Sequence, residues 1–294
     1  MKITNKNKLP KPFVDAVSKD YKYREKRYSV TTLLKPIREI MLMRRHGEEI
    51  EQDVSEMIWA IFGTACHSIL ENSGDAKHLL KEKSLEMKFG DYTLSGRSDL
   101  YNTASGCVVD YKVCSTFKVL KKDFEDYRKQ GLMYALMLKN MGYKVKKAQF
   151  ILVLRDWQKT KAKFDKTYPQ SQVVKKEFKF IEEDFEDIYQ WISDKFKEIA
   201  IAEKQQDSDL PLCSQEDRWN SGQTFAVMKN GRKTALRVLS TREEAEEYQE
   251  KNGGDYIQER QGEDRKCKEY CSCCYFCDYY KNFVKNDSAQ ALPF

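Results

Sequence analysis

Two kinds of hydrophobic spacing alternate along the first two thirds of the chain. Apolar residues recur at the spacing of one helix face, which predicts amphipathic helices, in residues 30–45, 53–71, 121–140 and 182–204. Short runs bounded by turn residues predict strands in residues 84–89, 93–101, 107–113, 148–154 and 173–180. We expect 148–154 to be a buried strand and 173–180 an edge strand. Helices before, within and after a small sheet indicate an α/β fold.

The last third of the chain has a different organisation. Residues 205–212 are mostly polar and predict a linker. Beyond it, the pattern predicts strands at 224–229, 234–239 and 256–259 and a helix at 241–252. Asn230-Gly231, between the first two strands, is a hairpin signal. We therefore expect four parts: a leader (1–27), a core (28–204), a linker (205–212) and a small cysteine-rich α+β unit (213–294).

Composition narrows the class of protein. Charged residues make up 33% of the chain and hydrophobic residues 40%, which is typical of a globular protein with a charged surface. No run of eighteen apolar residues offers a membrane span. The first eleven residues are polar and rich in lysine, which does not fit a secretory signal. We expect a cytoplasmic protein, in the host cell if it is encoded by a phage, with no membrane partner.

Positive charge is concentrated at the N-terminus. The first 45 residues contain thirteen Lys/Arg against four Asp/Glu, interleaved with tyrosines such as Tyr21 and Tyr28. Basic residues alternating with aromatic ones can follow a phosphate backbone and stack on bases. A solvated basic leader would have the same composition. The candidate DNA contacts in this segment are Arg24, Arg27, Lys35 and Arg38.

The segment between Gly96 and Val113 has the strongest chemical character. Asp99 ends a predicted strand, and Asp110 and Lys112 lie two apart in the next, so their side chains leave the same face. Two carboxylates brought together repel one another unless a cation lies between them. Such oxygen ligands suit Mg²⁺ or Mn²⁺, and a nearby lysine can orient water or stabilise charge on phosphate. An ordinary surface strand can also contain Asp-x-Lys.

Three residues on the predicted helices either extend this site or have structural roles. His67 is near Phe62 and Ile69, which predicts a position on the packed side of its helix. Such a histidine is either a satisfied core residue or, given the acids downstream, a metal ligand. Gln130 and Tyr134 share one helix face. They are either an amide beside a buried tyrosine or a polar pair directed at the site or the DNA.

In combination, these motifs resemble the RecB-like branch of the PD-(D/E)XK nuclease superfamily. That branch has, in order, a helix with G-x-x-x-H, a glutamate-led strand, G-x-x-D, D/E-x-K and Q-x-x-x-Y. The matching residues here are Gly63/His67, Glu86, Gly96/Asp99, Asp110/Lys112 and Gln130/Tyr134. The resemblance covers residues 28–134, and the segment beginning at Tyr28 is similar to phage-encoded exonucleases of the branch.

The resemblance implies both a fold and a set of roles. The fold is a restriction-endonuclease-like core, with a mixed central sheet flanked by helices. The metal ligands would be His67, Asp99 and Asp110, with the carbonyl of Val113. Lys112 would be the catalytic lysine. The remaining matches would support the site or the DNA (Gln130, Tyr134) or act as an accessory acid (Glu86).

Six of the nine cysteines lie in the last third of the chain. In a reducing compartment, close cysteines indicate metal ligation rather than disulfides. Cys267-x3-Cys271-x5-Cys277 resembles the C-terminal motif of iron–sulfur nucleases in the RecB-like group, including AddB-type and CRISPR-adaptation nucleases. The fourth ligand would be Cys213, although in those relatives the lone cysteine precedes the core. The resemblance implies a [4Fe–4S] cluster.

Other arrangements of the cysteines fit the same spacing. Four thiolates could equally hold zinc. Cys273 and Cys274 are surplus to a set of four, and either could replace a neighbouring ligand. The family pattern favours the iron–sulfur cluster, as do the nearby aromatic residues Tyr270, Tyr275, Phe276 and Tyr279.

The sequence thus predicts a divalent-metal-dependent deoxyribonuclease, an exonuclease acting on single-stranded or duplex DNA ends in recombination, repair or phage DNA processing. Its partners would be DNA and recombination or replication proteins. Two alternatives belong to other classes: a catalytically silent DNA-binding subunit of a recombination complex, and a metal-stabilised scaffold for protein interaction. Two acids converging beside a lysine favour the enzyme over both.

Overall fold

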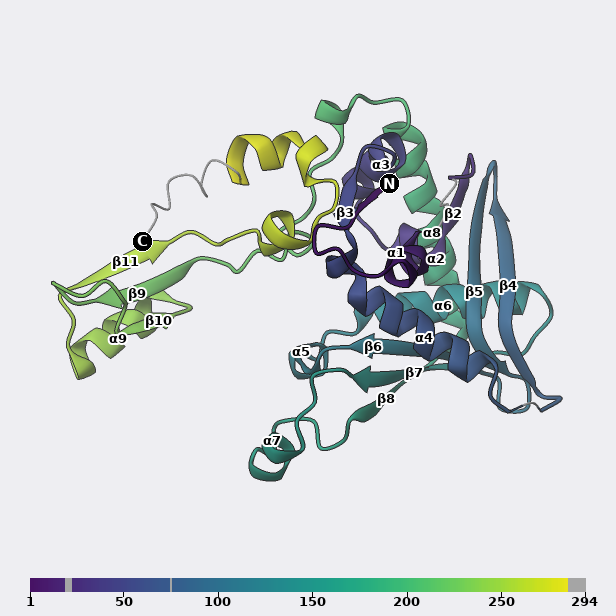
Figure 1. The fold of residues 1–294 in the computed structure, drawn as a ribbon, viewed down its shortest axis with the longest axis horizontal. Coiled ribbons are helices and arrows are strands. Elements are labelled where there is room, and N and C mark those ends of the chain that lie inside the picture. The colour runs from purple at the N-terminus through teal and green to yellow at the C-terminus, as the bar shows by residue number, and fades with distance from the viewer. Residues whose placement is uncertain (19–22, 75, 285–294) are drawn as a thin grey trace. The chain divides into compact units, whose positions relative to one another are not determined.

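The computed structural model describes residues 1–18, 23–74 and 76–284 and divides into two compact units (Figure 1). The first unit comprises residues 1–35 and 47–205, and the second comprises residues 36–46 and 206–294. Residues 36–46 therefore belong with the C-terminal part, although the sequence pattern had placed them in the core. Tyr21, in the basic leader, lies outside the described residues.

A six-stranded mixed sheet forms the centre of the first unit. Its strands are β2 (Arg27–Ser29), β4 (Leu79–Phe89), β5 (Tyr92–Asn102), β6 (Cys107–Cys114), β7 (Lys147–Leu154) and β8 (Val173–Lys179). The order is β2-β5-β6-β7-β8, with β4 paired to β5. Strands β6 and β7 are parallel, whereas β4–β5, β5–β6 and β7–β8 are antiparallel. Strand β8 lies at an edge of the sheet, as its pattern predicted.

Helices flank this sheet (Figure 1). The helices of the first unit are α1 (Lys11–Val17), α2 (Val30–Leu33), α4 (Ile58–Glu71), α5 (Thr116–Lys121), α6 (Glu125–Asn140), α7 (Lys159–Phe164) and α8 (Glu182–Ala202). A 3₁₀ turn, η1 (Val54–Met57), precedes α4, and the short strands β1 (Lys2–Thr4) and β3 (Glu51–Asp53) pair in parallel. Helix α6 packs closely on β7, where a Cβ at Gly131 would meet Ala148 at 2.7 Å.

Several predicted elements differ from the structure for identifiable reasons. The predicted helix at 30–45 is two helices, because Pro36 disfavours helical geometry at the residue before it. The predicted helix at 121–140 begins only at Glu125, since Lys122 has a positive φ of 57° and ends the short α5. Strand β7 is not buried on both faces: buried and half-buried residues alternate along it. Asp53 caps the 3₁₀ turn before α4, accepting the Ser55 N–H at 3.0 Å.

The second unit contains α3 and a small three-stranded sheet. Its elements are α3 (Ile37–His46), η2 (Asp207–Asp209), β9 (Thr224–Met228), β10 (Arg237–Leu239), α9 (Arg242–Asn252), β11 (Tyr256–Arg260) and the short turns η3 (Lys266–Tyr270), η4 (Cys274–Phe276) and η5 (Tyr280–Val284). The antiparallel order is β10-β9-β11. Thr241 caps α9 through its side chain. The predicted β9–β10 hairpin forms, but residues 229–236 connect the strands rather than two residues alone.

The segment predicted to be a linker is built into the second unit. Asp207 accepts hydrogen bonds from Arg45 and His46, both at 2.6 Å, and Leu210 is buried. The prediction of a linker rested on the polar composition of residues 205–212. Composition does not reveal that Asp207 has hydrogen-bond partners on α3.

A buried ion pair ties two distant parts of the second unit together. Arg218 Nε lies 3.1 Å from Asp264 Oδ2, and both side chains are almost fully buried. Asp264 also accepts hydrogen bonds from Asn220 and Tyr279, each at 2.7 Å. The carboxylate is thus satisfied by three donors. None of the helices in the described residues combines the length and apolar character that a membrane span requires.

Candidate metal and phosphodiester site

Three acidic residues fall in one row across neighbouring strands of the first unit. The β4–β5 register places Glu82 opposite Asp99, because Lys81 pairs with Leu100 and Lys83 pairs with Ser98. The β5–β6 pairing ends at Leu100 and Val109, so Asp99 and Asp110 are the next opposed positions, at the point where the strands separate. Directly opposed residues of antiparallel strands share a face of the sheet. The topology therefore directs Glu82, Asp99 and Asp110 toward one another.

The strands that pair with β5 separate beside the acidic row. On the side of β5 away from β4, β2 pairs with residues 93–95 and β6 with residues 100–102. None of the described strands pairs with residues 96–99 on that side. This unpaired stretch is the Gly96-to-Asp99 motif, and Asp99 uses its side chain there to accept the Tyr111 N–H at 2.7 Å.

His67 and Glu82 join Asp99 in a compact ligand set. One ligand atom from each of the three residues lies within 4.8 Å of the others. His67 Nδ1 lies 3.3 Å from Asp99 Oδ1, and the His67 ring meets the Tyr111 ring edge-on. Glu82 has a positive φ of 47°, a backbone conformation that costs energy in a residue with a Cβ and recurs at functional sites. Imidazole nitrogen and carboxylate oxygens suit Mn²⁺ or Mg²⁺.

Asp110 is held by helix α6 and neutralised by its neighbour on β6. Its Oδ1 accepts the side-chain N–H of Gln130 at 3.0 Å, and the same amide nitrogen lies 3.4 Å from the Tyr134 hydroxyl. Its Oδ2 is 2.6 Å from Lys112 Nζ, so the buried carboxylate and the ammonium form an ion pair.

The charges of the row are only partly compensated: Glu82 pairs with Arg97, and Asp110 pairs with Lys112. Burial raises the pKa of Asp110, and the nearby Asp99 raises it further, against the opposing effect of Lys112. Burial likewise raises the pKa of Glu82. The Asp99 carboxylate raises the pKa of His67, because it stabilises the protonated ring. Burial and neighbouring carboxylates thus make the ionised acids less favourable. One imidazole and three carboxylates, gathered in this way, are a donor set that fits a divalent cation.

Gly96 makes room for the side chain that supports this arrangement. A Cβ at Gly96 would lie 2.6 Å from Cε1 of Tyr134 and 3.1 Å from Cγ2 of Val30. Both side chains are buried. Only glycine therefore allows the Tyr134 ring to lie against β5 with its hydroxyl directed at Gln130.

The structure brings most of the predicted site residues together but changes one acid. The sequence predicted Glu86 as an accessory; instead, Glu86 is exposed and pairs with Arg27, and Glu82 occupies the row. Glu82 was missed because the predicted strand began at residue 84, whereas β4 begins at Leu79. Val113 continues β6 one residue beyond Lys112 and pairs with Val153.

His67 is placed differently from the prediction. Its expected packed surroundings, Phe62 and Ile69, are exposed, and no residue of α4, all of which the structure describes, is buried. The His67 side chain itself is one third exposed. The His67 ring is therefore held by its contact with Asp99 rather than by an apolar core.

The predicted DNA contacts at the N-terminus fall into two groups. Arg24 is exposed, and Arg27 and Lys35 are half-buried in the first unit. Arg38, in contrast, is 7% exposed in the second unit and donates to the carbonyls of Leu210 and Pro211. A guanidinium satisfied by buried carbonyls is structural, which corrects the prediction that Arg38 contacts DNA.

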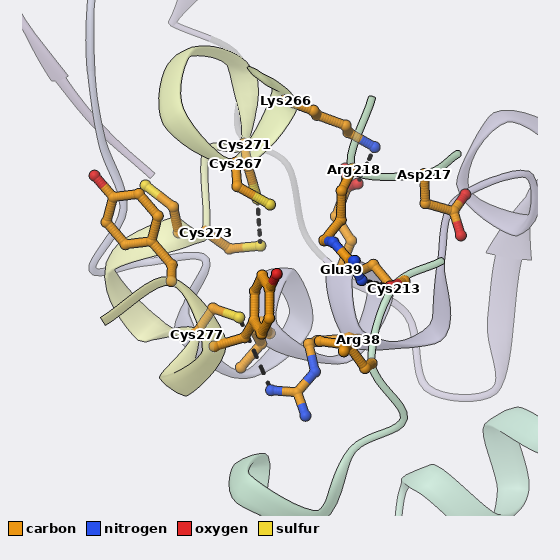
Figure 2. Close-up of a pocket in the computed structure, with 15 residues that line it drawn as sticks. Arg38, Glu39, Cys213, Asp217, Arg218, Lys266, Cys267, Cys271, Cys273 and Cys277 are labelled. Carbon is orange, nitrogen blue, oxygen red and sulfur yellow. Dashed lines mark hydrogen bonds and ion pairs between the residues drawn. The ribbon is translucent and has the colours of Figure 1, made fainter. Parts of the chain in front are cut away.

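Six cysteines line one pocket in the second unit (Figure 2). They are the four predicted ligands and the two surplus residues: Cys213, Cys267, Cys271, Cys277, Cys273 and Cys274. Cys271 and Cys273 have their sulfurs 3.6 Å apart, and the guanidinium of Arg38 lies 3.8 Å from the Cys277 sulfur. The fold thus brings the distant Cys213 to the C-terminal cluster. Of the aromatic residues predicted to surround it, Tyr279 lines the pocket, whereas Tyr270 and Tyr275 are exposed.

In this pocket, the negative charge of an ionised thiol is poorly compensated by the surrounding residues. Burial raises the pKa of Cys213 to about 11 and that of Cys267 to about 12, and neighbouring thiols add to both shifts. The contact with Cys273 lowers the pKa of Cys271. Buried, mutually repelling thiolates become favourable when a metal or cluster neutralises them. The donor set therefore fits a thiolate-bound centre.

Comparison with known proteins gives distant likenesses only. No family model and no curated protein matches the chain. The solved structure of the protein SSO0001 is 15% identical and has a TM-score of 0.43, covering 66% of this chain and 83% of its own. A phage related exonuclease from Haemophilus somnus 129PT is 15% identical, with a TM-score of 0.30, 57% of this chain covered and 74% of its own. Scores this low do not establish a shared fold, so the residues of the site carry the functional assignment.

Proposed function

We propose that this chain is a divalent-metal-dependent nuclease that hydrolyses phosphodiester bonds in DNA, acting on DNA ends. The observation that supports it best is the row of Glu82, Asp99 and Asp110 beside Lys112 at the point where β5 and β6 separate. A non-catalytic binding protein gains nothing from placing three acids where a polyanion must approach. Metal-assisted phosphodiester hydrolysis requires that placement.

In the proposed site, His67, Glu82 and Asp99 hold Mg²⁺ or Mn²⁺, with Asp110 next in the row. When bound, such a cation supplies Lewis-acid chemistry to the phosphate and to water. Lys112 contributes a fixed positive charge beside Asp110, which stabilises the negative charge that builds up on phosphate oxygens during cleavage.

Two further residues position these groups. Gln130 fixes the Asp110 carboxylate by donating to one of its oxygens, which leaves the other for Lys112 and the cation. Tyr134, wedged against Gly96, supports the Gln130 amide. They are positioning residues, because both act through Asp110.

The test is a cleavage assay with labelled linear DNA and closed circular DNA, in Mn²⁺, Mg²⁺ or EDTA. We expect metal-dependent loss of linear DNA while circles survive, and no cleavage by Asp110→Ala or Lys112→Ala. Undiminished cleavage by either folded variant would refute the site. Cleavage of circles would make the protein an endonuclease, and tight DNA binding without cleavage would make it a binding subunit.

The proposal extends to a structural metal centre in the second unit. Cys213, Cys267, Cys271 and Cys277 hold a [4Fe–4S] cluster, with zinc as the alternative, and their thiolates fasten residue 213 to the C-terminal turns. A brown protein with visible absorbance supports the cluster, and a colourless protein containing stoichiometric zinc supports the alternative.

A further inference from the structure

Helix α4 carries an exposed aromatic pair in the turns that precede His67. Trp59 is 46% exposed and Phe62 is 56% exposed, and their ring centroids are 5.6 Å apart. Both residues lie in a largely apolar helix without a single buried residue. Large rings gathered in water beside a candidate active site indicate a binding surface rather than a core element.

A gap lies on the same stripe of this helix. Trp59, Gly63 and His67 follow one another at intervals of four residues, so they share one helix face. The stripe is about 12 Å long, from the rise per residue of an α-helix. A Cβ at Gly63 would meet nothing within 4 Å. Glycine weakens a helix interior, and no neighbouring side chain requires a glycine at this position. The open space at Gly63 lies between Trp59 and the candidate metal ligand His67 on this stripe.

Positive charge lies against the aromatic end of the helix. The guanidinium of Arg155 lies 4.2 Å from the centre of the Trp59 ring. Arg155 follows β7, and its N–H donates to the carbonyl of Cys114 at the end of β6, so the segments after these two strands lie together. Residues 115–122 and 155–163 contain seven Lys/Arg and one Asp. That acid, Asp156, is engaged by the N–H of Thr116 at 2.6 Å.

Among the described residues, most of these cations have no acidic partner, although Lys118, Lys161 and Lys163 lie over aromatic rings of the protein. Within the described chain, Lys121 is the one member of the seven that forms an ion pair, with Asp123 at 3.2 Å. The exposed side chains of Phe117 and Leu120 stand among them on α5. Exposed aromatic rings interleaved with unpaired cations match the chemistry of an unpaired nucleic-acid strand, which offers base faces and phosphates together.

We propose that the α4 platform, defined as Trp59, Phe62, Phe117 and Arg155, binds single-stranded DNA. It stacks unpaired bases and leads the strand past the open space at Gly63 to the acidic row. The proposal rests on the proposed nuclease function and adds its substrate class, a single-stranded end or overhang. Duplex DNA is the poorer ligand, because its paired bases are stacked on one another and present only their edges and phosphates to the protein.

The test measures binding, not cleavage. Fluorescence anisotropy in EDTA gives the affinity of the full chain for a labelled oligothymidine and for a duplex of equal length. Trp59→Ala is expected to weaken oligothymidine binding about tenfold, from the energy of one base stacked on an aromatic ring. Trp59→Phe should retain most of the affinity, and duplex binding should change little. Because Trp59 is half exposed, circular dichroism should show both variants folded.

A second pair of variants tests the open space. Gly63→Gln places a straight-chain, helix-favouring side chain in the gap, so the helix becomes more stable while oligothymidine binding falls. Ser68→Gln, at an exposed position on another face of α4, is the matched control and should bind normally. Wild-type oligothymidine affinity in both Trp59→Ala and Gly63→Gln would overturn the proposal, as would an equal loss of duplex binding.

The outcome is independent of catalysis because EDTA removes the metal. If the protein binds single-stranded DNA through Trp59 but cleaves no DNA, the proposed platform is supported and the proposed nuclease function is refuted. If the protein cleaves DNA in the presence of metal but its affinity for single-stranded DNA is unchanged in Trp59→Ala, only the proposed platform is refuted.

Discussion

Replacing Gly96 by alanine tests whether the site depends on the close approach of β5 and α6. The new methyl would lie 2.6 Å from a ring carbon of Tyr134 and 3.1 Å from a methyl of Val30. Both neighbours are buried, so neither can move into solvent. Overpacking a filled core costs typically about 1–3 kcal/mol, and this approach is at the severe end, so we expect a loss of about 3 kcal/mol. The melting temperature should fall by roughly 8 °C.

Urea unfolding of four proteins measures this effect: wild type, Gly96→Ala, Tyr134→Leu and the double variant. Removing the ring relieves the clash, so the Gly96→Ala penalty should shrink by at least about 1 kcal/mol in the Tyr134→Leu background. Gly63→Ala is the control, because open space there makes alanine neutral or stabilising by up to about 1 kcal/mol. An equal Gly96→Ala penalty in both backgrounds, or none in either, would refute the reasoning.

Three further predictions concern the second unit. Asp264→Ala should cost about 3–5 kcal/mol in urea unfolding, because it leaves the buried Arg218 without its partner; a loss below about 1 kcal/mol would contradict the buried pair. Burial raises the pKa of Asp264, but three hydrogen-bond donors outweigh it and lower the pKa overall, so its contribution to stability is present above the unfolded pKa of about 4 and is lost as the pH falls through the folded value. Unfolding followed between pH 6 and 3 should show that loss in the wild type and less of it in Asp264→Asn, and equal slopes would count against the linkage. Cys271→Ser should lose the visible absorbance of the proposed cluster while Cys114→Ser, in the first unit, keeps it; retained absorbance in Cys271→Ser would exclude that ligand.

Local chemistry in the sequence predicted much of the framework. The cap residues Asp53 and Thr241 stand where the sequence pattern began the corresponding helices. Strands β5 and β6 also lie where their patterns predicted, because alternation and turn residues act over a few positions, whereas β4 begins at Leu79 rather than at residue 84. Tyr134 and Gln130 share a helix face by spacing alone, and the structure directs that face at Asp110.

Long-range pairing decided what the sequence could not. The predicted strand began at residue 84, and only the longer pairing of β4 with β5 brings Glu82 into the row. Arg38 was predicted to contact DNA because it lies in the basic first 45 residues, but its guanidinium is satisfied by carbonyls some 170 residues away in the chain. The composition of a segment does not show which distant carbonyl groups will accept hydrogen bonds from its side chains.

The apolar pattern of α4 shows a second limit of sequence reasoning. Apolar residues at helical spacing predicted a packed face, yet Trp59, Phe62 and Ile69 are exposed. Periodicity identifies a surface that prefers contact with apolar groups. It does not distinguish contact with the rest of the protein from contact with a ligand.

The most direct test of the acidic row compares two glutamates on one strand. Single-turnover cleavage of end-labelled linear DNA in Mn²⁺ should be measured for wild type, Glu82→Gln and Glu86→Gln. Because Glu82 belongs to the ligand set and Glu86 pairs with Arg27, we expect Glu82→Gln to be slower by about a hundredfold and Glu86→Gln to cleave near the wild-type rate. Equal rates for the two variants, or a wild type that cleaves nothing in any divalent metal, would contradict the proposed site.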